Sequence, residues 1–506
     1  MKKWPIEVLL VCAGSSFAQA QHSAVAFYLD PDYRGSVKDG SPAHPWAALD
    51  WGAVNAALAA GDATVYFSAR RASGDTDQVY GAPDEIDLTR KVGGAFILTL
   101  DGRSCYNAND AAPDWQPYSG KSMAKVRNFN AQNSAHVKYS NVTIDGFRIS
   151  MTASGKAINI CGDNWVVRRS DIFHTAGAAD GPLVQIVPTA DGPHEGSSAW
   201  CPASSNITIE NNLIHDSHGE LIYAGGGGCS ARDSGGSAAL CMGFPSHDHV
   251  TLRDNIIYNG GVYGGQGDGI DVKGGYTNLV IVGNTIYNLN DPAGSGVRAI
   301  VHQGARDGDP DQNNLIAGND IHDVNAEDAA IALADTWGTP RGVEVRNNVI
   351  ATSSESGIKV YGGANIFLNN NTIYRSGACG LFIAAGSVVL RNNLLLANNA
   401  GGAQTSLQGT LTSSHNAYSN AWSGACAQCV SDLAAADLVD PGGSDFHLPA
   451  GSKAKDAGLD LSDSFTLDKD GVSRPQGAGW DIGAYEYVSS SPDATPPAEP
   501  KGLWLR

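Results

Sequence analysis

Alternating apolar and polar residues recur along this chain in one short pattern, apolar-x-apolar-x-x-Asn-x-apolar. Alternation with a period of two is typical of a strand that buries one face, and the asparagine follows where each strand ends. Seven of the nine copies carry the asparagine, and the first two have Phe147 and Ser170 in its place. The copies begin at Val142, Trp165, Ile207, Val250, Leu279, Asn314, Val343, Ile366 and Val388.

Successive copies begin 22 to 43 residues apart, so the bare unit is about 22 residues long. That length fits one turn of a parallel β-helix rather than a two-helix repeat. An earlier short strand belongs to each turn, for example over residues 221–224 and 269–273. We therefore predict an all-β parallel β-helix solenoid, with turns stacked at about 4.8 Å and the asparagines forming a ladder at one corner.

The two ends of the chain depart from the repeat. An alanine-rich stretch over residues 47–60 predicts a helix that covers the open end of the first turn. The Ser/Pro-rich end reads as a linker. The predicted domains are a signal peptide over 1–20, an N-terminal helical cap and first turns over 21–126, the β-helix with long loops in its central turns over 127–400, C-terminal turns and a cap over 401–488, and a tail over 489–506.

Composition bears on location and partners. Lys2 and Lys3 precede an apolar run and small residues, which predicts export with cleavage after Ala20. No later stretch is long and apolar enough to span a bilayer. A formal net charge of −19 argues against a nucleic-acid partner, and an acidic polysaccharide would need a local cation to offset the repulsion. We expect a monomer that is secreted, periplasmic or located at the cell surface.

Eight cysteines remain after the predicted cleavage, and an exported chain can form disulfides. Cys229 and Cys241 could close the glycine-rich loop between them. Cys426 and Cys429 are spaced as a metal or redox pair, but the chain has no second pair at zinc spacing. We therefore favour a local disulfide between these two.

The N-terminal cap, the repeat and the ending AGWDIGAYEY over residues 478–487 resemble the exported right-handed parallel β-helix proteins of the pectate-lyase-like superfamily. The resemblance covers about residues 26–487. It implies a right-handed β-helix. It does not imply a reaction, because such helices carry lyases, hydrolases, epimerases and adhesins.

The stretch over residues 265–288 contains the strongest candidate chemistry, because Asp268, Asp271 and Lys273 fall within six residues of one strand. Asp271 and Lys273 share a face, while Asp268 reaches it only through a bend at its glycine neighbours. Glu220 opens the equivalent strand one turn earlier. Glu220, Asp268 and Asp271 would then form an acidic cluster suited to calcium.

Bound calcium would neutralise an acidic sugar, and Lys273 would remove the proton next to its carboxylate. Arg298, His302 or Tyr223, within about one turn, would steady the intermediate or protonate the leaving oxygen. A register slip of one residue would turn His302 inward. Substrate contacts are expected from Lys359, Tyr361, Trp337 and His218.

Two lyase groups resemble this stretch in part. In chondroitinase B and related alginate lyases an acidic calcium ligand precedes the base lysine by five residues, as Asp268 precedes Lys273, but Gln266 stands here in place of a second glutamate. Calcium-dependent pectate lyases match Asp268 and Asp271 and differ at Gly267. The resemblance implies calcium-assisted β-elimination of a uronate polysaccharide.

Other interpretations stay open. The Asp-Gly-Ile-Asp run also suits a β-helix corner, and the paired carboxylates could serve a glycoside hydrolase. The chain lacks the other motifs of the polygalacturonase-like hydrolases and the Asp-Pro-His motif of alginate epimerases. An epimerase would share the proton abstraction, and a carbohydrate-binding surface β-helix would need no catalysis. For His215, His218, His247 and His249 we favour ordinary surface positions.

Overall fold

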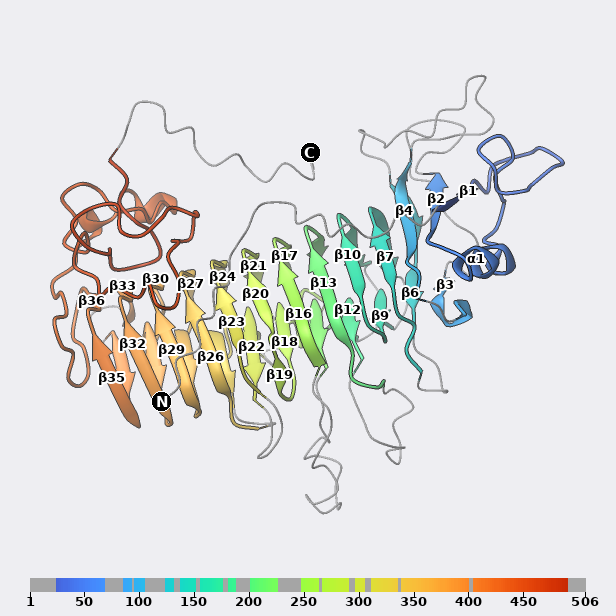
Figure 1. The fold of residues 1–506 in the computed structure, drawn as a ribbon. Coiled ribbons are helices and arrows are strands. Elements are labelled where there is room, and N and C mark those ends of the chain that lie inside the picture. Colours follow the sequence, from blue (N-terminus) through green and yellow to red (C-terminus); the bar gives the residue numbers. More distant parts are fainter. Residues whose placement is uncertain are drawn as a thin grey trace, which may run out of the picture.

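The structure is a computed structural model that describes residues 24–68, 85–92, 95–104, 123–131, 137–151, 155–175, 181–187, 201–225, 247–263, 266–290, 296–304, 311–334, 338–399 and 404–489. Three long sheets of parallel strands run the length of the molecule, and the chain crosses each sheet once per turn (Figure 1). This architecture is the predicted all-β parallel β-helix. Trp337, the signal peptide and the pair Cys229 and Cys241 lie outside the described residues.

The first sheet contains all nine copies of the repeat. Their starting residues pair in register from Val142 to Val388. The sheet also extends beyond them, since Leu98 pairs with Val142 and Leu411 pairs with Val388. In order, its strands are β1 (Val25–Leu29), β2 (Ala63–Ser68), β4 (Leu98–Ser104), β7 (Val142–Asp145), β10 (Trp165–Arg168), β13 (Ser205–Glu210), β16 (His247–Arg253), β20 (Val280–Val282), β23 (Asn314–Ala317), β26 (Arg341–Arg346), β29 (Ala364–Asn369), β32 (Ser387–Arg391) and β35 (Thr410–Ser414), with β19 (Tyr276–Thr277) beside β16.

The second sheet follows the asparagine corner, and the third sheet holds the earlier strand of each turn. The second consists of β5 (Ala124–Val126), β8 (Phe147–Met151), β11 (Asp171–His174), β14 (Leu213–His215), β17 (Ile256–Tyr258), β21 (Thr285–Leu289), β24 (Asp320–Val324), β27 (Val349–Ser353), β30 (Thr372–Tyr374), β33 (Leu394–Leu396) and β36 (Ala417–Tyr418). The third consists of β3 (Glu85–Asp87), β6 (Asn128–Asn130), β9 (Ile158–Ile160), β12 (Val184–Ile186), β15 (Ile222–Ala224), β18 (Ile270–Val272), β22 (Ile300–Gln303), β25 (Ala329–Ala334), β28 (Ser356–Val360), β31 (Leu381–Ile383) and β34 (Thr405–Leu407).

The predicted asparagine ladder lies at the corner between the first two sheets. Asn284 is typical, because its side-chain oxygen accepts hydrogen bonds from the backbone and side-chain nitrogens of Asn255 at 3.1 and 3.0 Å. Its own Nδ2 donates to the carbonyl of Leu252 at 2.9 Å and to Oδ1 of Asn319 at 3.0 Å. These buried amides therefore satisfy backbone groups that the corner leaves without a strand partner.

Aromatic side chains stack along the outer face of the second sheet. The rings of His215 and Tyr258 lie 4.9 Å apart and those of Tyr258 and Tyr287 lie 5.1 Å apart, almost parallel. His215 also bonds to Asp171 and to its neighbour Asp216. Tyr258 and Tyr287 therefore have a packing role in this stack.

The helical cap at the N-terminal end is α1 (Trp51–Leu58), shorter than the predicted stretch. Asp50 caps it by accepting a hydrogen bond from the Ala53 amide at 3.1 Å. At the other end the chain after β36, which includes the short 3₁₀ helices η4 (Ala435–Asp437) and η5 (Pro441–Gly443), lies beside the last turns (Figure 1). Asn370 donates to two carbonyls of this segment, at Asp481 and Gly483.

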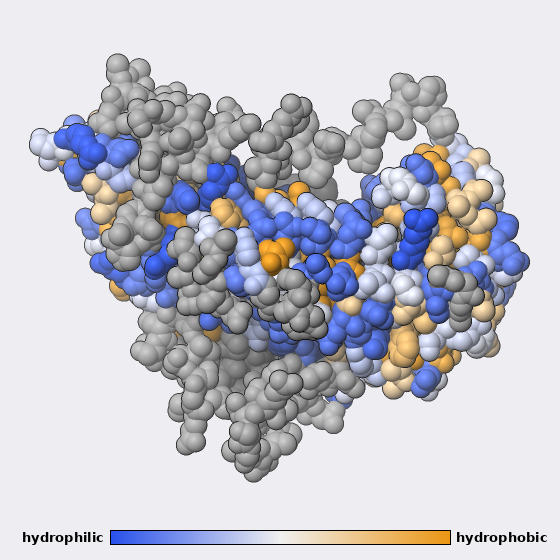
Figure 2. All heavy atoms as spheres, turned by 180° about the vertical axis from the view of Figure 1, so that it is seen from behind, coloured by the Kyte–Doolittle hydropathy of each residue, from blue (hydrophilic) through white to orange (hydrophobic). Residues whose placement is uncertain are grey.

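Two disulfides occur in the described parts of the chain, Cys161 with Cys201 and Cys426 with Cys429, and the second confirms the predicted local pair. Within the ranges given above, no helix combines the length and hydrophobicity that a bilayer crossing requires. On the face shown in Figure 2, apolar side chains of the described residues form small patches among hydrophilic ones.

Candidate functional site

The outer face of the third sheet carries the predicted site. Gln185, Tyr223, Asp271 and Val301 occupy one outward column, because each pairs with the next across strands β12, β15, β18 and β22. Glu220 aligns with Asp268 in the same register, as predicted. Neighbouring positions in such a column are about 4.8 Å apart, so side chains of adjacent turns can touch one substrate group.

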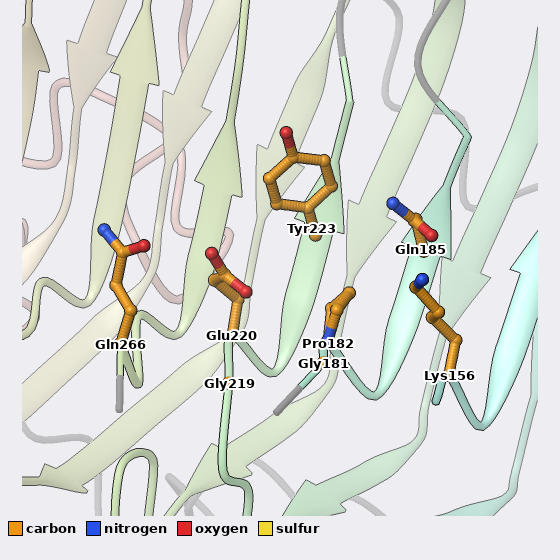
Figure 3. A pocket seen from close by; sticks show the side chains of 8 residues that line it. All are labelled: Lys156, Gly181, Pro182, Gln185, Gly219, Glu220, Tyr223 and Gln266. Carbon is orange, nitrogen blue, oxygen red and sulfur yellow. The ribbon is translucent and has the colours of Figure 1, made fainter. Parts of the chain in front are cut away.

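A cavity of about 400 Å³ opens over these turns. Figure 3 shows Gln266, Glu220, Pro182 and Lys156 in one row from successive turns, with Tyr223 and Gln185 rising from the adjoining strands. Gly181 and Gly219 complete the lining. The cavity therefore combines one carboxylate, one ammonium group, two amides and a phenol.

The ion pair between Asp271 and Lys273 lies next to Tyr223. Lys273 Nζ is 2.7 Å from Asp271 Oδ2, and the Asp271 side chain is fully buried whereas Lys273 keeps 15% exposure. Burial raises the pKa of Asp271 against the opposing effects of Lys273 and Arg298. The ammonium group of Lys273 is therefore fixed against the buried carboxyl of Asp271.

The side chain of Asp268 does not reach the cavity or the outer surface around it, which we call the groove. Its side chain is buried, Oδ1 accepts a hydrogen bond from the Arg298 amide at 2.6 Å, and Oδ2 has no hydrogen-bond partner. Burial and the carboxylate of Asp271 raise the pKa of Asp268 to about 8. The predicted bend toward the surface is wrong, and this carboxyl holds a proton at neutral pH.

Arg298 follows Asp268 in the next turn and is fixed by two acidic side chains. Its Nε lies 2.9 Å from Asp328 Oδ1 and its Nη2 lies 2.8 Å from Glu327 Oε2. Asp328 also bonds to Lys359 at 3.4 Å and to the hydroxyl of Tyr361. The guanidinium is therefore held beside the groove with 14% of its side chain exposed.

His302 is not part of the groove. His302 pairs with the inward-facing Val272, one residue away from the outward position of Asp271. Its side chain therefore turns into the interior. Its side chain is fully buried and its Nε2 lies 3.2 Å from Asp311 Oδ1. Val301 instead occupies the outward position next to Asp271. The predicted catalytic role of His302 is therefore wrong.

The predicted substrate-binding residues Lys359 and His218 lie in different places relative to the ion pair between Asp271 and Lys273. Lys359 is three strands from Asp271 in the outward column, or roughly 14 Å, and its Nζ lies 4.3 Å from the centre of the Tyr361 ring. His218 immediately precedes the cavity-lining Gly219 and Glu220. His247 is fully buried, which overturns its predicted surface position, whereas His249 is exposed beside Asp248.

The three predicted calcium ligands do not form a donor set. Asp271 is paired with Lys273, Asp268 is buried and bonded to backbone, and only Glu220 lines the cavity. The described part of the chain contains no group of three or more His, Cys, Asp or Glu residues placed to hold a metal ion. As placed, these residues do not offer calcium the six to eight oxygen ligands that it takes.

Lys156, Gln185 and Asp328 contribute to this face although no motif marks them. Lys156 and Gln185 line the cavity, and Asp328 holds Arg298, Lys359 and Tyr361 together. Continuing the strand register through every turn would place Gln185 in the column of Asp271. Asp328 lies before its strand, where the alternation gives no signal.

Residues 197–434 match the family described as right handed beta helix region. With the three parallel sheets, this match confirms a right-handed parallel β-helix. A search with the sequence found no match among curated proteins.

Several solved structures are similar in fold. They include an alginate lyase from Paenibacillus sp. str. FPU-7 (12% identity, TM-score 0.36, covering 80% of this chain and 99% of that chain). The A-module of the mannuronan C-5 epimerase AlgE4 of Azotobacter vinelandii is 11% identical, with a TM-score of 0.37 over 80% of this chain and 95% of that chain. PfbA, a surface adhesin of Streptococcus pneumoniae, is 15% identical, with a TM-score of 0.37 over 75% and 89%. At these values the similarity concerns the fold alone.

Proposed function

We propose that this right-handed β-helix is a secreted carbohydrate-active enzyme, a polysaccharide lyase that cleaves a uronate-containing chain by β-elimination. One observation carries the proposal: a lysine paired with a buried carboxyl stands beside a tyrosine of the adjacent turn, at the edge of a cavity on the outer face. The pair supplies a base, and the tyrosine supplies an acid.

The base is Lys273. The buried carboxyl of Asp271 lies 2.7 Å from Lys273 Nζ and holds the lysine in position, and Lys273 acts in its neutral amine form. The amine then removes the proton from the sugar carbon next to the carboxylate. Arg298, charged and partly exposed, is placed to stabilise the negative charge that develops on that carboxylate.

The acid is Tyr223. Burial raises the pKa of its phenol, so Tyr223 stays protonated in the groove. It donates that proton to the glycosidic oxygen as the carbon–oxygen bond breaks and a carbon–carbon double bond forms. Lys273 ends the step protonated and Tyr223 ends it ionised, and a proton passed back through solvent restores both.

The carboxylates fit a hydrolase less well. A glycoside hydrolase needs two carboxyl groups facing the bond to be cleaved. Of the three predicted acidic residues only Glu220 lines the cavity, because Asp268 and Asp271 are buried. Elimination instead uses Tyr223, which lines the cavity, and Lys273, which is partly exposed on the adjacent turn.

The test follows ultraviolet absorbance of the unsaturated product during incubation with alginate, polygalacturonate and glycosaminoglycans, with and without added calcium. Wild type is expected to produce absorbance on at least one polymer. Lys273→Ala is expected to lower the rate at least about 100-fold, because a positioned general base contributes that much or more.

Lys138→Ala is the matched control, since Lys138 also pairs with an aspartate, Asp163, at 2.8 Å, but precedes strand β7 of the first sheet and does not directly follow a strand of the third. Its rate should equal that of wild type. New reducing ends without absorbance would replace the lyase with a hydrolase. Exchange of the sugar proton with solvent, without cleavage, would indicate an epimerase. Absence of all three signals would leave a binding protein.

A further inference from the structure

Tyr263 is an exposed aromatic ring beside the cavity. Its exposed fraction is 37%, and the other large hydrophobic side chains that the structure describes as exposed are all valines, at positions away from this loop. Several other tyrosines in the described chain are packed into stacks or the core, as Tyr258 and Tyr276 are. An aromatic face left in water next to a polar cavity needs an explanation.

The ring of Tyr263 is held in place by His218, which adjoins the lining of the cavity. It stacks on the imidazole of His218, with ring centres 4.8 Å apart and planes 28° apart. The backbone amide of His218 in turn donates to Nδ1 of the buried His174 at 3.1 Å. Because His218 directly precedes Gly219 and Glu220, the stacked pair stands at the rim of the cavity.

The backbone on the other side of Tyr263 is fixed as well. Gly260 and Gly261 pack so closely on Gly267 that a Cβ on Gly267 would collide with their backbone. Gly267 follows Gln266, which lines the cavity (Figure 3). The turn that carries Tyr263 is thus anchored to the start of strand β18, and its ring is preorganised rather than free to collapse.

Resting on the proposed function, we propose that Tyr263, supported by His218, forms a sugar-stacking subsite of the same groove. A pyranose ring has an apolar C–H face and polar edges. The tyrosine ring matches the face, while Glu220, Gln266 and Gln185 across the cavity supply hydrogen bonds for the hydroxyls. The ligand class is therefore an oligosaccharide that lies along the groove, with one sugar against Tyr263.

The test measures binding rather than turnover. Short oligosaccharides of mannuronate and of galacturonate are titrated calorimetrically into Lys273→Ala, and into the same protein carrying Tyr263→Ala, Tyr263→Phe or Tyr263→Trp. Removal of the ring is expected to weaken binding about tenfold. Phe and Trp are expected to retain affinity, because stacking uses the ring and not the hydroxyl. Tyr28→Ala is the matched control, since Tyr28 also stacks on another aromatic ring, that of Tyr66, at 5.3 Å in the first turns.

Equal affinity of the Ala variant and its background, or equal losses for Ala and Phe, would overturn the subsite. Circular dichroism and the melting temperature of each variant identify losses that come from misfolding. Binding that depends on Tyr263 in a protein that makes no unsaturated product would keep the subsite and refute the lyase. Elimination by wild type, together with binding that does not depend on Tyr263, would keep the lyase and refute the subsite.

Discussion

Replacing Asp268 by asparagine should make the protein less sensitive to alkaline pH. The side chain is buried, with one oxygen on the Arg298 amide and the other without a hydrogen-bond partner. An asparagine has the same shape, keeps the acceptor for Arg298 and carries its unpaired hydrogens where the protonated carboxyl carries one. At pH values below about 4, where the unfolded carboxyl is protonated as well, the two proteins should therefore be about equally stable.

The difference grows as the pH rises. Burial and Asp271 raise the pKa of Asp268 from 3.8 to about 8. Between these values the unfolded carboxyl has lost its proton and the folded one has kept it, so stability falls with pH until the folded group ionises. At about 1.4 kcal/mol per pKa unit, wild type loses at most about 6 kcal/mol that Asp268→Asn does not lose.

The assay is urea unfolding followed by tryptophan fluorescence at pH 5 and pH 9, for wild type, Asp268→Asn and the exposed-site control Asp463→Asn. Titration of the groups that do not interact with Asp268 cancels in the difference between variants. Asp268→Asn should gain several kcal/mol relative to wild type at pH 9, and the control should gain none. A variant that follows wild type at both pH values would show that Asp268 is ionised in the folded protein, and would refute our account of its burial.

Two further predictions concern stability. Asn284→Ala leaves the buried Asn255 amide and a backbone carbonyl without partners, and should lower the free energy of urea unfolding by about 2–5 kcal/mol. The control Asn206→Gly, at an exposed left-handed turn position, should lower it by less than about 1 kcal/mol. Similar losses for both variants would refute the stabilising role of the asparagine ladder. For His215, burial opposes the charged ring, but the hydrogen bonds that the ring donates to two aspartates raise its pKa. The stabilisation from the charged ring is therefore full below its ordinary pKa and is lost as the pH rises through the folded value. His215→Gln should therefore destabilise the protein more at pH 5.5 than at pH 9, and an equal cost at both would contradict the shift.

The repeat predicted most of the fold because each asparagine and each alternating strand is a local signal. The dependence on local signals also explains which strands the repeat did not predict. Leu411 continues the first sheet and Asn416 continues the ladder, but Ser413 stands where the pattern expects an apolar residue. The three strands before Val142 have no asparagine corner and gave no signal.

The site was predictable only where strand register was predictable. Glu220 and Asp268 align as the sequence suggests, while the turn of His302 is offset by one residue, which exchanges the inner and outer faces. Burial was also invisible in the sequence. Alternation gives the direction of a side chain such as Asp271, but the atoms that cover it come from other turns.

The constant pairing of turns with very different lengths has a consequence for how such a protein can change. Adjacent copies of the repeat differ in spacing from 22 to 43 residues, yet their strands pair without a shift. Insertions are therefore absorbed at the corners and do not propagate along the rod. Evolution or engineering can lengthen, exchange or remove a corner segment, and so alter the surface around the cavity, while the scaffold that positions Lys273 and Tyr223 is inherited unchanged.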